Sequence, residues 1–163
     1  MIRLLTAAQL VSAGIVGGAM VAVEVAIVPV TNSLTDEDSV RVHQLVDRYI
    51  DPFMPIHTFF SLGLAGMLII RRRSRAARAL IGVAAGLSAT VAVISASQNL
   101  PINRLVASWS PQAVPASWPE LRTKWAQAHR GRTIAAMFAL VASGLAAVVA
   151  EPGDNIAQGE IAP

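Results

Sequence analysis

The sequence contains no cysteine. This absence excludes disulfides, thiolate metal sites and a cysteine nucleophile, and it leaves the redox compartment undetermined. Charged residues are scarce as well: they make up 14% of the 163 residues, whereas soluble domains carry about a quarter. No glycine motif for a nucleotide or flavin and no P-loop is present. The net charge of +3 suits the cationic loops of a membrane protein, and we infer no nucleic-acid partner from it.

The apolar residues, 54% of the chain, gather in four long runs. The hydrocarbon core of a bilayer is about 30 Å thick and needs about 20 apolar residues per helix. The runs predict transmembrane helices over residues 4–30, 52–70, 79–99 and 126–150. The first run is too long for the apolar core of a cleaved signal peptide, so we expect it to remain as an anchor. The sequence therefore predicts an all-α integral membrane protein, an up-and-down four-helix bundle forming one domain over residues 1–150.

The segment between the first two predicted helices has a helical pattern of its own. Its apolar residues recur at helical spacing among charged ones: Val42, Leu45, Val46, Tyr49 and Ile50. This pattern predicts a short amphipathic helix at the membrane interface, capped by Asp36 or Ser39. We expect His43 to be solvated there. At the other end of the chain, residues 151–163 predict a disordered acidic tail.

Two further patterns bear on orientation and packing. A dense basic turn precedes the third predicted helix and lies on the same side as Arg3: Arg71, Arg72, Arg73, Arg75 and Arg78. The positive-inside rule then places both termini in the cytoplasm, with the bundle in a bacterial-type cytoplasmic membrane. The GxxxG pairs Gly14/Gly18 and Gly82/Gly86 predict close approach of another helix. Small bundles of this kind often form homo-oligomers, although the sequence does not set the oligomeric state.

Unusual polar residues fall at one end of the predicted bundle. In an up-and-down topology the end of helix one, the start of two, the end of three and the start of four meet at one membrane face. The polar residues at those places are Glu24, His57, Gln98, Asn99, Asn103, His129 and Arg132. An ionisable group inside the membrane costs about 2.5–3.5 kcal/mol on insertion scales and usually faces the bundle interior. Because Trp125, His129 and Arg132 share one helical face, the sequence predicts a polar pocket there.

Each of these residues also has a purely structural interpretation. Glu24 can pair with His129 or Arg132 and so neutralise a buried charge. His57 can bind a carbonyl freed by a nearby proline, and the asparagines can simply terminate the third helix. The tryptophans, including Trp125, are typical of interfacial anchors.

The functional interpretation leaves three chemistries open. Two histidines and a carboxylate (His57, His129 and Glu24) can hold a non-haem metal with open positions for O₂. The two imidazoles can instead ligate a haem between two helices. Without a cofactor, a histidine can act as general base on a carbon acid whose anion reacts with oxygen. The residues alone do not choose among these chemistries.

A family resemblance narrows the choice of function. Pro101-Ile102-Asn103 closes a hydrophobic helix, and Trp125-x-x-x-His129-x-x-Arg132 opens the last one some twenty residues later. This arrangement resembles the anthrone oxygenase-like membrane family, which includes fungal enzymes that oxidise anthrones to anthraquinones and many bacterial members of unknown role. The resemblance covers essentially the whole chain. It implies an oxygenase that converts a reactive methylene to a carbonyl on a small aromatic or lipophilic substrate.

The resemblance and the bundle geometry together assign the predicted site. Asn103, Trp125, His129 and Arg132 match the family pattern, whereas Glu24 and His57 come from the geometry. The predicted catalytic residues are His129, His57 and Glu24, and the predicted substrate-binding residues are Asn99, Asn103, Trp125 and Arg132. No motif indicates a cofactor, and a haem or a non-haem metal stays open.

The functional prediction is a membrane-embedded oxygenase or oxidoreductase that acts on a small lipophilic or aromatic substrate in a polar pocket at one membrane face. The alternative is a non-enzymatic haem- or metal-binding membrane module or accessory subunit. A small transporter fits less well, because one face of the bundle has no polar path and no broken helix is evident in mid-membrane.

Overall fold

A computed structural model of the chain describes residues 1–50 and 52–149. Every regular element in these ranges is helical, which confirms the predicted all-α class. The predicted acidic tail, residues 151–163, and the last residue of the fourth predicted helix lie outside the described residues.

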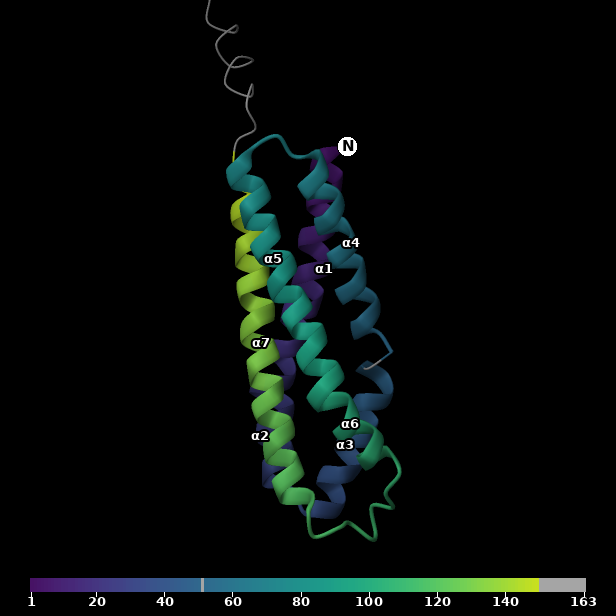
Figure 1. Cartoon of the computed structure of the whole chain (residues 1–163). Helices are drawn as coiled ribbons and strands as arrows, with labels where there is room; N and C mark the ends of the chain where they lie inside the picture. Colours follow the sequence, from purple (N-terminus) through teal and green to yellow (C-terminus); the bar gives the residue numbers. More distant parts are fainter. Residues whose placement is uncertain (51, 150–163) are drawn as a thin grey trace, which may run out of the picture.

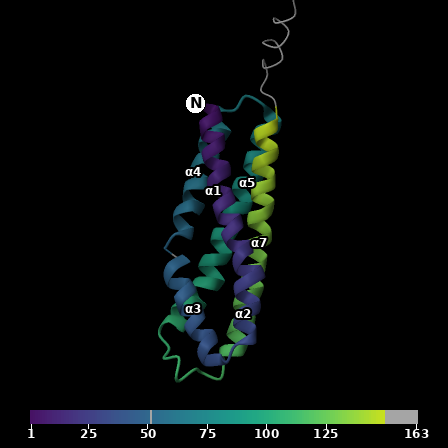
Figure 2. The same ribbon diagram turned by 180° about the vertical axis from the view of Figure 1, so that it is seen from behind.

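The helices form an elongated up-and-down bundle (Figures 1 and 2). Its elements are α1 (Ile2–Ala22), the π-helical turn η1 (Val23–Ile27), α2 (Val28–Ser33), α3 (Asp36–Ile50), α4 (Met54–Arg71), α5 (Arg75–Ile94), the π-helical turn η2 (Ser95–Asn99), α6 (Leu100–Ala107) and α7 (Trp118–Val148). The α1–η1–α2 and α5–η2–α6 segments each run on as one rod. Around the bundle, α1 packs on α4 and α7, and α5 packs on α4 and α7.

Within the described residues, four helical segments are long and apolar enough to cross a membrane: Ile2–Ser33, Met54–Arg71, Arg75–Ala107 and Trp118–Val148. The predicted membrane bundle is thereby confirmed. At about 1.5 Å per residue, α4 spans about 27 Å and matches a hydrocarbon core, whereas the other three span about 47–50 Å. The three longer segments therefore extend beyond the thickness that α4 covers, and α3 occupies the space below α4.

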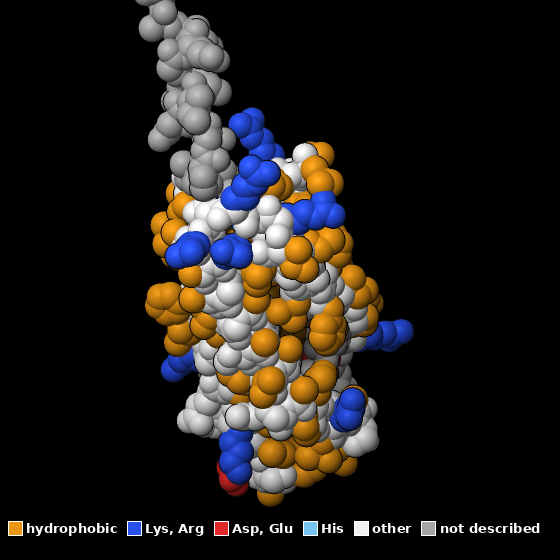
Figure 3. Space-filling model, turned by 45° about the horizontal axis from the view of Figure 1, so that its top comes forward, with side chains coloured by type: hydrophobic (Ala, Val, Ile, Leu, Met, Phe, Trp, Pro, Cys, Tyr) orange, Lys and Arg blue, Asp and Glu red, His pale blue; other side chains and the backbone are white. Residues whose placement is uncertain are grey.

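The two ends of the bundle differ in charge. Figure 3 shows Lys and Arg side chains gathered at the end that carries the N-terminus and the α4–α5 connection, and we call it the arginine end. No Asp, Glu, Lys or Arg occurs at positions 4–23, 54–70, 79–103 or 133–149. These stretches form one uncharged band below the arginine end. The opposite end, with residues 34–35 and the 108–117 connection, is called the loop end.

Two helices run further than predicted, and prolines explain both differences. The third predicted helix does not stop at 99 but continues through η2 and α6, with Pro101 in the first turn of α6. The last helix begins at Trp118 with Pro119 in its first turn, eight residues before the predicted start. Proline breaks a helix interior but suits a first turn, where no backbone N–H is needed, and a π turn opens the hydrogen-bond ladder before it.

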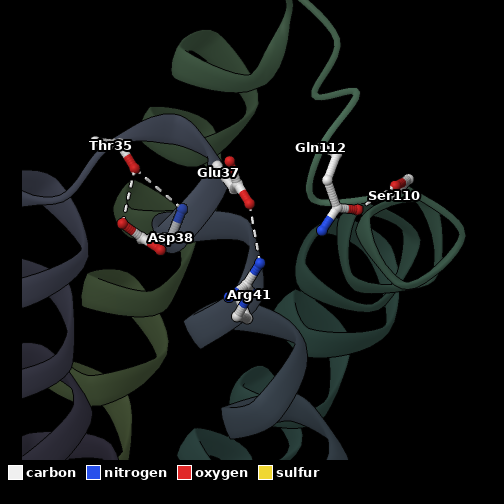
Figure 4. A network of polar contacts seen from close by, with 6 residues as sticks. All are labelled: Thr35, Glu37, Asp38, Arg41, Ser110 and Gln112. Atoms are coloured by element: carbon white, nitrogen blue, oxygen red, sulfur yellow. Dashed lines mark hydrogen bonds and ion pairs between the residues drawn. The ribbon is translucent and has the colours of Figure 1, made fainter.

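The α3 helix is present as predicted, but its cap and its buried face differ. Figure 4 shows Thr35 at its start: the hydroxyl accepts from the Asp38 amide at 3.2 Å and donates to the Asp38 carboxylate at 3.0 Å. The predicted caps Asp36 and Ser39 do not serve this role, because both lie inside α3. In Figures 1 and 2, α3 lies below α4 along the bundle, and it contacts α2 and α6.

The glycine pairs do not pack within the bundle. A Cβ atom placed on Gly14, Gly18, Gly82 or Gly86 meets no heavy atom within 4 Å. Gly17 instead faces α7, where a Cβ would lie 3.5 Å from the sulfur of Met137. Helix rotation thus turns the GxxxG pairs of α1 and α5 outward, and the close α1–α7 approach depends on the glycine between them.

Candidate functional site

Departures from regular α-helix cluster where the uncharged band ends. The turns η1 and η2 and the break between α3 and α4 all fall there, and both π turns contact α7. Single π turns inside α-helices are often found at functional sites. At this level α7 carries His129 and Arg132, which are close to Met20 of α1 and Ser95 of η2.

The partners of His129 fix its hydrogen position. The ring is 1% exposed, and its Nε2 lies 3.0 Å from the carbonyl oxygen of Met20. A carbonyl only accepts, so Nε2 carries the hydrogen and donates it. Nδ1 then holds the lone pair and accepts from Nε of Arg132 at 3.2 Å and from Nη2 at 3.0 Å. Both ring nitrogens are therefore engaged, and in this arrangement neither is open to a metal or a haem.

Arg132 is held from three sides. Besides the two hydrogen bonds to His129, its Nη1 donates to the hydroxyl of Ser95 at 3.1 Å. Its guanidinium lies 5.7 Å from the ring centre of Trp125, and that indole stacks on His129 with ring centres 5.1 Å apart and planes 2° apart. The shared face predicted for Trp125, His129 and Arg132 thus brings the three side chains into contact.

The two predicted asparagines bind Trp125. The indole Nε1 donates to Oδ1 of Asn103 at 2.7 Å, and Nδ2 of Asn99 donates to the Trp125 carbonyl at 3.2 Å. Both asparagines are buried inside a continuing helical rod, so they do not terminate it. Asn103 also donates through Nδ2 to the carboxylate of Asp47 on α3. It therefore ties α3, α6 and α7 together.

The expectation that His43 is solvated is wrong. Its ring is 8% exposed and lies edge-on to Trp118 and Trp125, with ring centres 5.4 and 5.0 Å away. Its Nε2 lies 3.2 Å from Oδ1 of Asn103, which already accepts from Trp125. The apolar pattern of α3 was misleading, because Leu45 is 49% exposed while the more polar side faces the bundle. The i, i+4 spacing of His43 and Asp47 places both on one face of the helix, and this spacing was the signal in the sequence that they share a partner.

Glu24 and His57 lie apart from the His129–Arg132 pair. Glu24, in η1, pairs with Nε of Arg130 at 2.9 Å. His57 faces α1, where the Ser12 hydroxyl donates to its carbonyl at 3.0 Å and lies 3.4 Å from its Nδ1. Within residues 1–50 and 52–149, no three His, Cys, Asp or Glu side chains lie close enough together to hold a metal. The metal set His57, His129 and Glu24 is thus not assembled in this part of the chain.

A cleft of about 130 Å³ lies beside Arg132, and we call it the α4–α5 cleft. Its walls are mainly apolar and include Met20, Met54, Phe59, Val91 and Leu100. Ser95 and Arg132 supply polar groups to it. A smaller adjoining space of about 30 Å³ is lined by both Arg132 and His129. The cleft thus combines an apolar volume with a cation whose neighbour, His129, is a potential base.

The sequence model of a family described as anthrone oxygenase matches residues 42–142. The matched segment includes His43, Asn99, Asn103 and the Trp125–Arg132 face, and it excludes Glu24. No curated protein and no solved structure is significantly similar to the chain.

Proposed function

The chain belongs to the anthrone oxygenase family, and on that premise we propose that it is a membrane-embedded oxygenase acting on a small lipophilic aromatic substrate. The observation that supports this proposal most is the α4–α5 cleft with Arg132 in its wall. Small-molecule pockets are mostly apolar and carry a few polar groups. The cleft has both properties.

The cleft suits a substrate that arrives from the lipid. Its wall residue Phe59 is 65% exposed, and Ala96 is exposed too, so the cleft borders the outer surface of the uncharged band. A fused-ring substrate dissolved in the bilayer reaches this position without crossing a polar layer. Its flat apolar body packs against Met20 and Met54, and its carbonyl oxygen faces Arg132.

The reaction of this family converts a methylene to a carbonyl, R₂CH₂ + O₂ → R₂C=O + H₂O. Loss of a methylene proton leaves an enolate whose charge rests largely on the carbonyl oxygen. Arg132 stabilises that oxygen in the apolar cleft, where a cation acts more strongly than in water. The electron-rich anion adds O₂ at carbon, the resulting peroxide anion takes back the proton that the base removed, and the hydroperoxide loses water to give the ketone.

His129 is the base in this proposal, and the substrate makes its lone pair accessible. Before binding, Nδ1 is covered by Arg132, and Nε2 donates to Met20. An oxyanion forming in the cleft competes for the donors of Arg132. As the guanidinium turns toward the substrate, Nδ1 is uncovered and takes the proton, while the Met20 carbonyl keeps the ring in place. Substrate binding and base activation are thereby coupled.

The test uses the purified protein in detergent with anthrone as the probe, and it follows anthraquinone formation and O₂ consumption above the spontaneous rate. Arg132→Gln is expected to lower turnover about 10²–10³-fold, the usual effect of removing an oxyanion donor. Arg104→Gln, an exposed arginine on α6, is the matched control and should leave turnover unchanged. Wild-type turnover in a folded Arg132→Gln protein would contradict the proposal.

An absorption spectrum and metal analysis of the same sample test the alternative of a haem- or metal-binding module. A Soret band or a stoichiometric metal, without O₂-dependent turnover, would replace the oxygenase proposal.

We further propose a bacterial-type cytoplasmic membrane as the location, with the arginine end in the cytoplasm. The support is the charge asymmetry of the bundle together with the positive-inside rule.

A further inference from the structure

The small space beside His129 adjoins the α4–α5 cleft but differs from it in size and in lining. It measures about 30 Å³, against about 130 Å³ for the cleft. Met20, Met54 and Arg132 line both spaces, whereas His129 lines only the smaller one. We call this smaller space the His129 annex. An aromatic ring is too large for it, so the proposed base borders a volume that the ring of the substrate does not fill.

The annex has the size and the wall of a site for a very small apolar molecule. A water-sized molecule needs about 10–15 Å³, so the annex holds about two bonded atoms of that size. Five of its seven lining residues are apolar: Ala19, Met20, Val23, Ile50 and Met54. These properties match a diatomic molecule such as O₂, which is more soluble in hydrocarbon than in water.

Water is a poorer occupant, because the two polar wall residues already have partners. Nε2 of His129 donates to the Met20 carbonyl, and Nδ1 accepts from Nε and Nη2 of Arg132. The remaining nitrogen of Arg132, Nη1, donates to the Ser95 hydroxyl. A buried water usually makes two to four hydrogen bonds, whereas an apolar diatomic molecule needs none. The wall therefore favours a gas over water.

We propose that the His129 annex binds O₂ during turnover, an inference that rests on the proposed oxygenase function. The rings of the substrate lie in the cleft, and the methylene carbon lies at the boundary of the two spaces, where His129 takes its proton. O₂ in the annex is then next to this carbon, on the side from which the proton left. The two substrates thus occupy separate spaces that meet at the reacting carbon.

Arg132 and His129 both act in the oxygen step. One electron passes from the substrate anion to O₂, and the resulting radical and superoxide combine to form the C–O bond. The negative charge thereby moves from the carbonyl oxygen in the cleft to the terminal peroxide oxygen in the annex. Arg132 lines both spaces, so its guanidinium stabilises the charge in either position. The protonated His129 returns its proton to the terminal oxygen, and the O–O bond breaks only when the hydroperoxide loses water.

The test measures anthrone oxidation by the purified protein at saturating anthrone and several O₂ concentrations. Ala19→Val adds two methyl groups to the annex wall, in the space that the two atoms of O₂ would take. We expect kcat/KM for O₂ to fall about tenfold, because the site loses apolar contact equivalent to about two methylene groups. The KM for anthrone should stay near the wild-type value. Ala22→Val, the same change at an exposed position of α1, is the matched control and should alter neither constant.

A variant of the cleft should give the opposite pattern. Ala92→Leu narrows the α4–α5 cleft, so it should raise the KM for anthrone and leave kcat/KM for O₂ near the wild-type value. Circular dichroism confirms the fold of each variant. An unchanged kcat/KM for O₂ in a folded Ala19→Val protein would overturn the annex proposal and leave the oxygenase function standing. Absence of anthrone oxidation by the wild-type protein would instead contradict the oxygenase function, on which this inference rests.

A second measurement uses the wild-type protein and needs no turnover. O₂ is paramagnetic, so it broadens the NMR signals of the methyl groups that it contacts. Met20 lines the annex and is 3% exposed, so O₂ dissolved in the detergent does not contact it from outside. With methyl-labelled methionine under O₂ pressure, we expect broadening of the Met20 signal that Ala19→Val removes and Ala92→Leu preserves. A Met20 signal that O₂ leaves sharp would overturn the proposal.

Discussion

The three histidines show how surroundings decide what a side chain can do. His43 is enclosed by tryptophans and contacts Asn103, whereas His57 lies against Ser12 and Phe53. His129 alone has its lone pair directed at a guanidinium beside a cleft. Their types and spacing are visible in the sequence, but their partners are not. Only His129 is therefore assigned the role of a base.

His129→Ala tests that assignment. The variant removes the proposed base and leaves the Met20 carbonyl and the Arg132 donors without this partner. Turnover of anthrone should fall at least about 10²-fold, the lower range for general base catalysis, while the helix content stays unchanged. Turnover and circular dichroism are measured on the same preparation, with Arg41→Gln on the surface of α3 as control. A folded variant with unchanged turnover would remove His129 from the mechanism.

Asn103→Ala tests the role of Asn103 in joining three helices. The substitution leaves the Trp125 indole, the His43 ring and the Asp47 carboxylate each without one hydrogen bond. Each unsatisfied buried group costs about 1–3 kcal/mol, so we expect a loss of about 2–4 kcal/mol after partial relaxation.

The measurement is unfolding in a mild detergent titrated with a denaturing one. Ser110→Ala is the control for Asn103→Ala. It breaks an exposed hydrogen bond to Gln112 (Figure 4) and should change stability by less than about 0.5 kcal/mol. A similar stability for the two variants would show that the buried network around Asn103 contributes little.

At the scale of the elements, the π turns decide which side chains of the helical rods lie at the site. η2 carries Ser95 to Arg132 and Asn99 to the Trp125 carbonyl, and the α5–α6 rod continues past it despite Pro101. The break between α3 and α4 places Met54 in the cleft wall. A regular α-helix in either place would present different side chains, because each residue of helix turns the face by about 100°.

The α1 glycines differ in packing: Gly17 faces α7, whereas Gly14 and Gly18 face outward. Gly17→Leu inserts a side chain against Met137 and Leu140 of α7, whose atoms already lie 3.5 and 3.8 Å from a Cβ position. Overpacking of this kind costs about 1–3 kcal/mol. Gly14→Leu meets open space within the bundle and should be nearly neutral. Detergent unfolding compares the two, and a larger loss for Gly14→Leu would indicate that this face packs against another helix in an assembly.

At the scale of the whole molecule, the bundle has two layers with different chemistry. The uncharged band is close to α4 in length, and it ends at η1, at the start of α4 and at Arg132 on three of the four spanning segments. Beyond it, α2, α3, α6 and the start of α7 form a layer with charged and aromatic side chains. The α4–α5 cleft lies at the boundary of the two layers. In the proposed reaction, a lipid-soluble substrate therefore meets Arg132 there without leaving the membrane.

Because the chain has no cysteine, single introduced cysteines report orientation directly. We expect Gln112→Cys at the loop end to react with a membrane-impermeant maleimide in intact cells. Arg73→Cys at the arginine end should react only after permeabilisation, since basic loops are retained in the cytoplasm. The readout is the labelled fraction of purified protein. Labelling of Arg73→Cys in intact cells would reverse the proposed orientation.

The sequence by itself determined the membrane class, the four spanning helices and the residues of the Trp125–His129–Arg132 face. These properties depend on local composition and on helical spacing, which the order of residues contains directly. The sequence was least informative at Pro101 and Pro119, because a proline ends a helix or begins one according to the backbone before it.

Only the tertiary structure decided which partners these residues have. It placed Arg132 on the lone pair of His129, buried His43 beside Asn103, and paired Glu24 with Arg130. These contacts depend on the rotation of each helix about its axis, which packing sets over the whole bundle. One π turn shifts that rotation for every residue that follows, so the contacts are not contained in the spacing along any single helix.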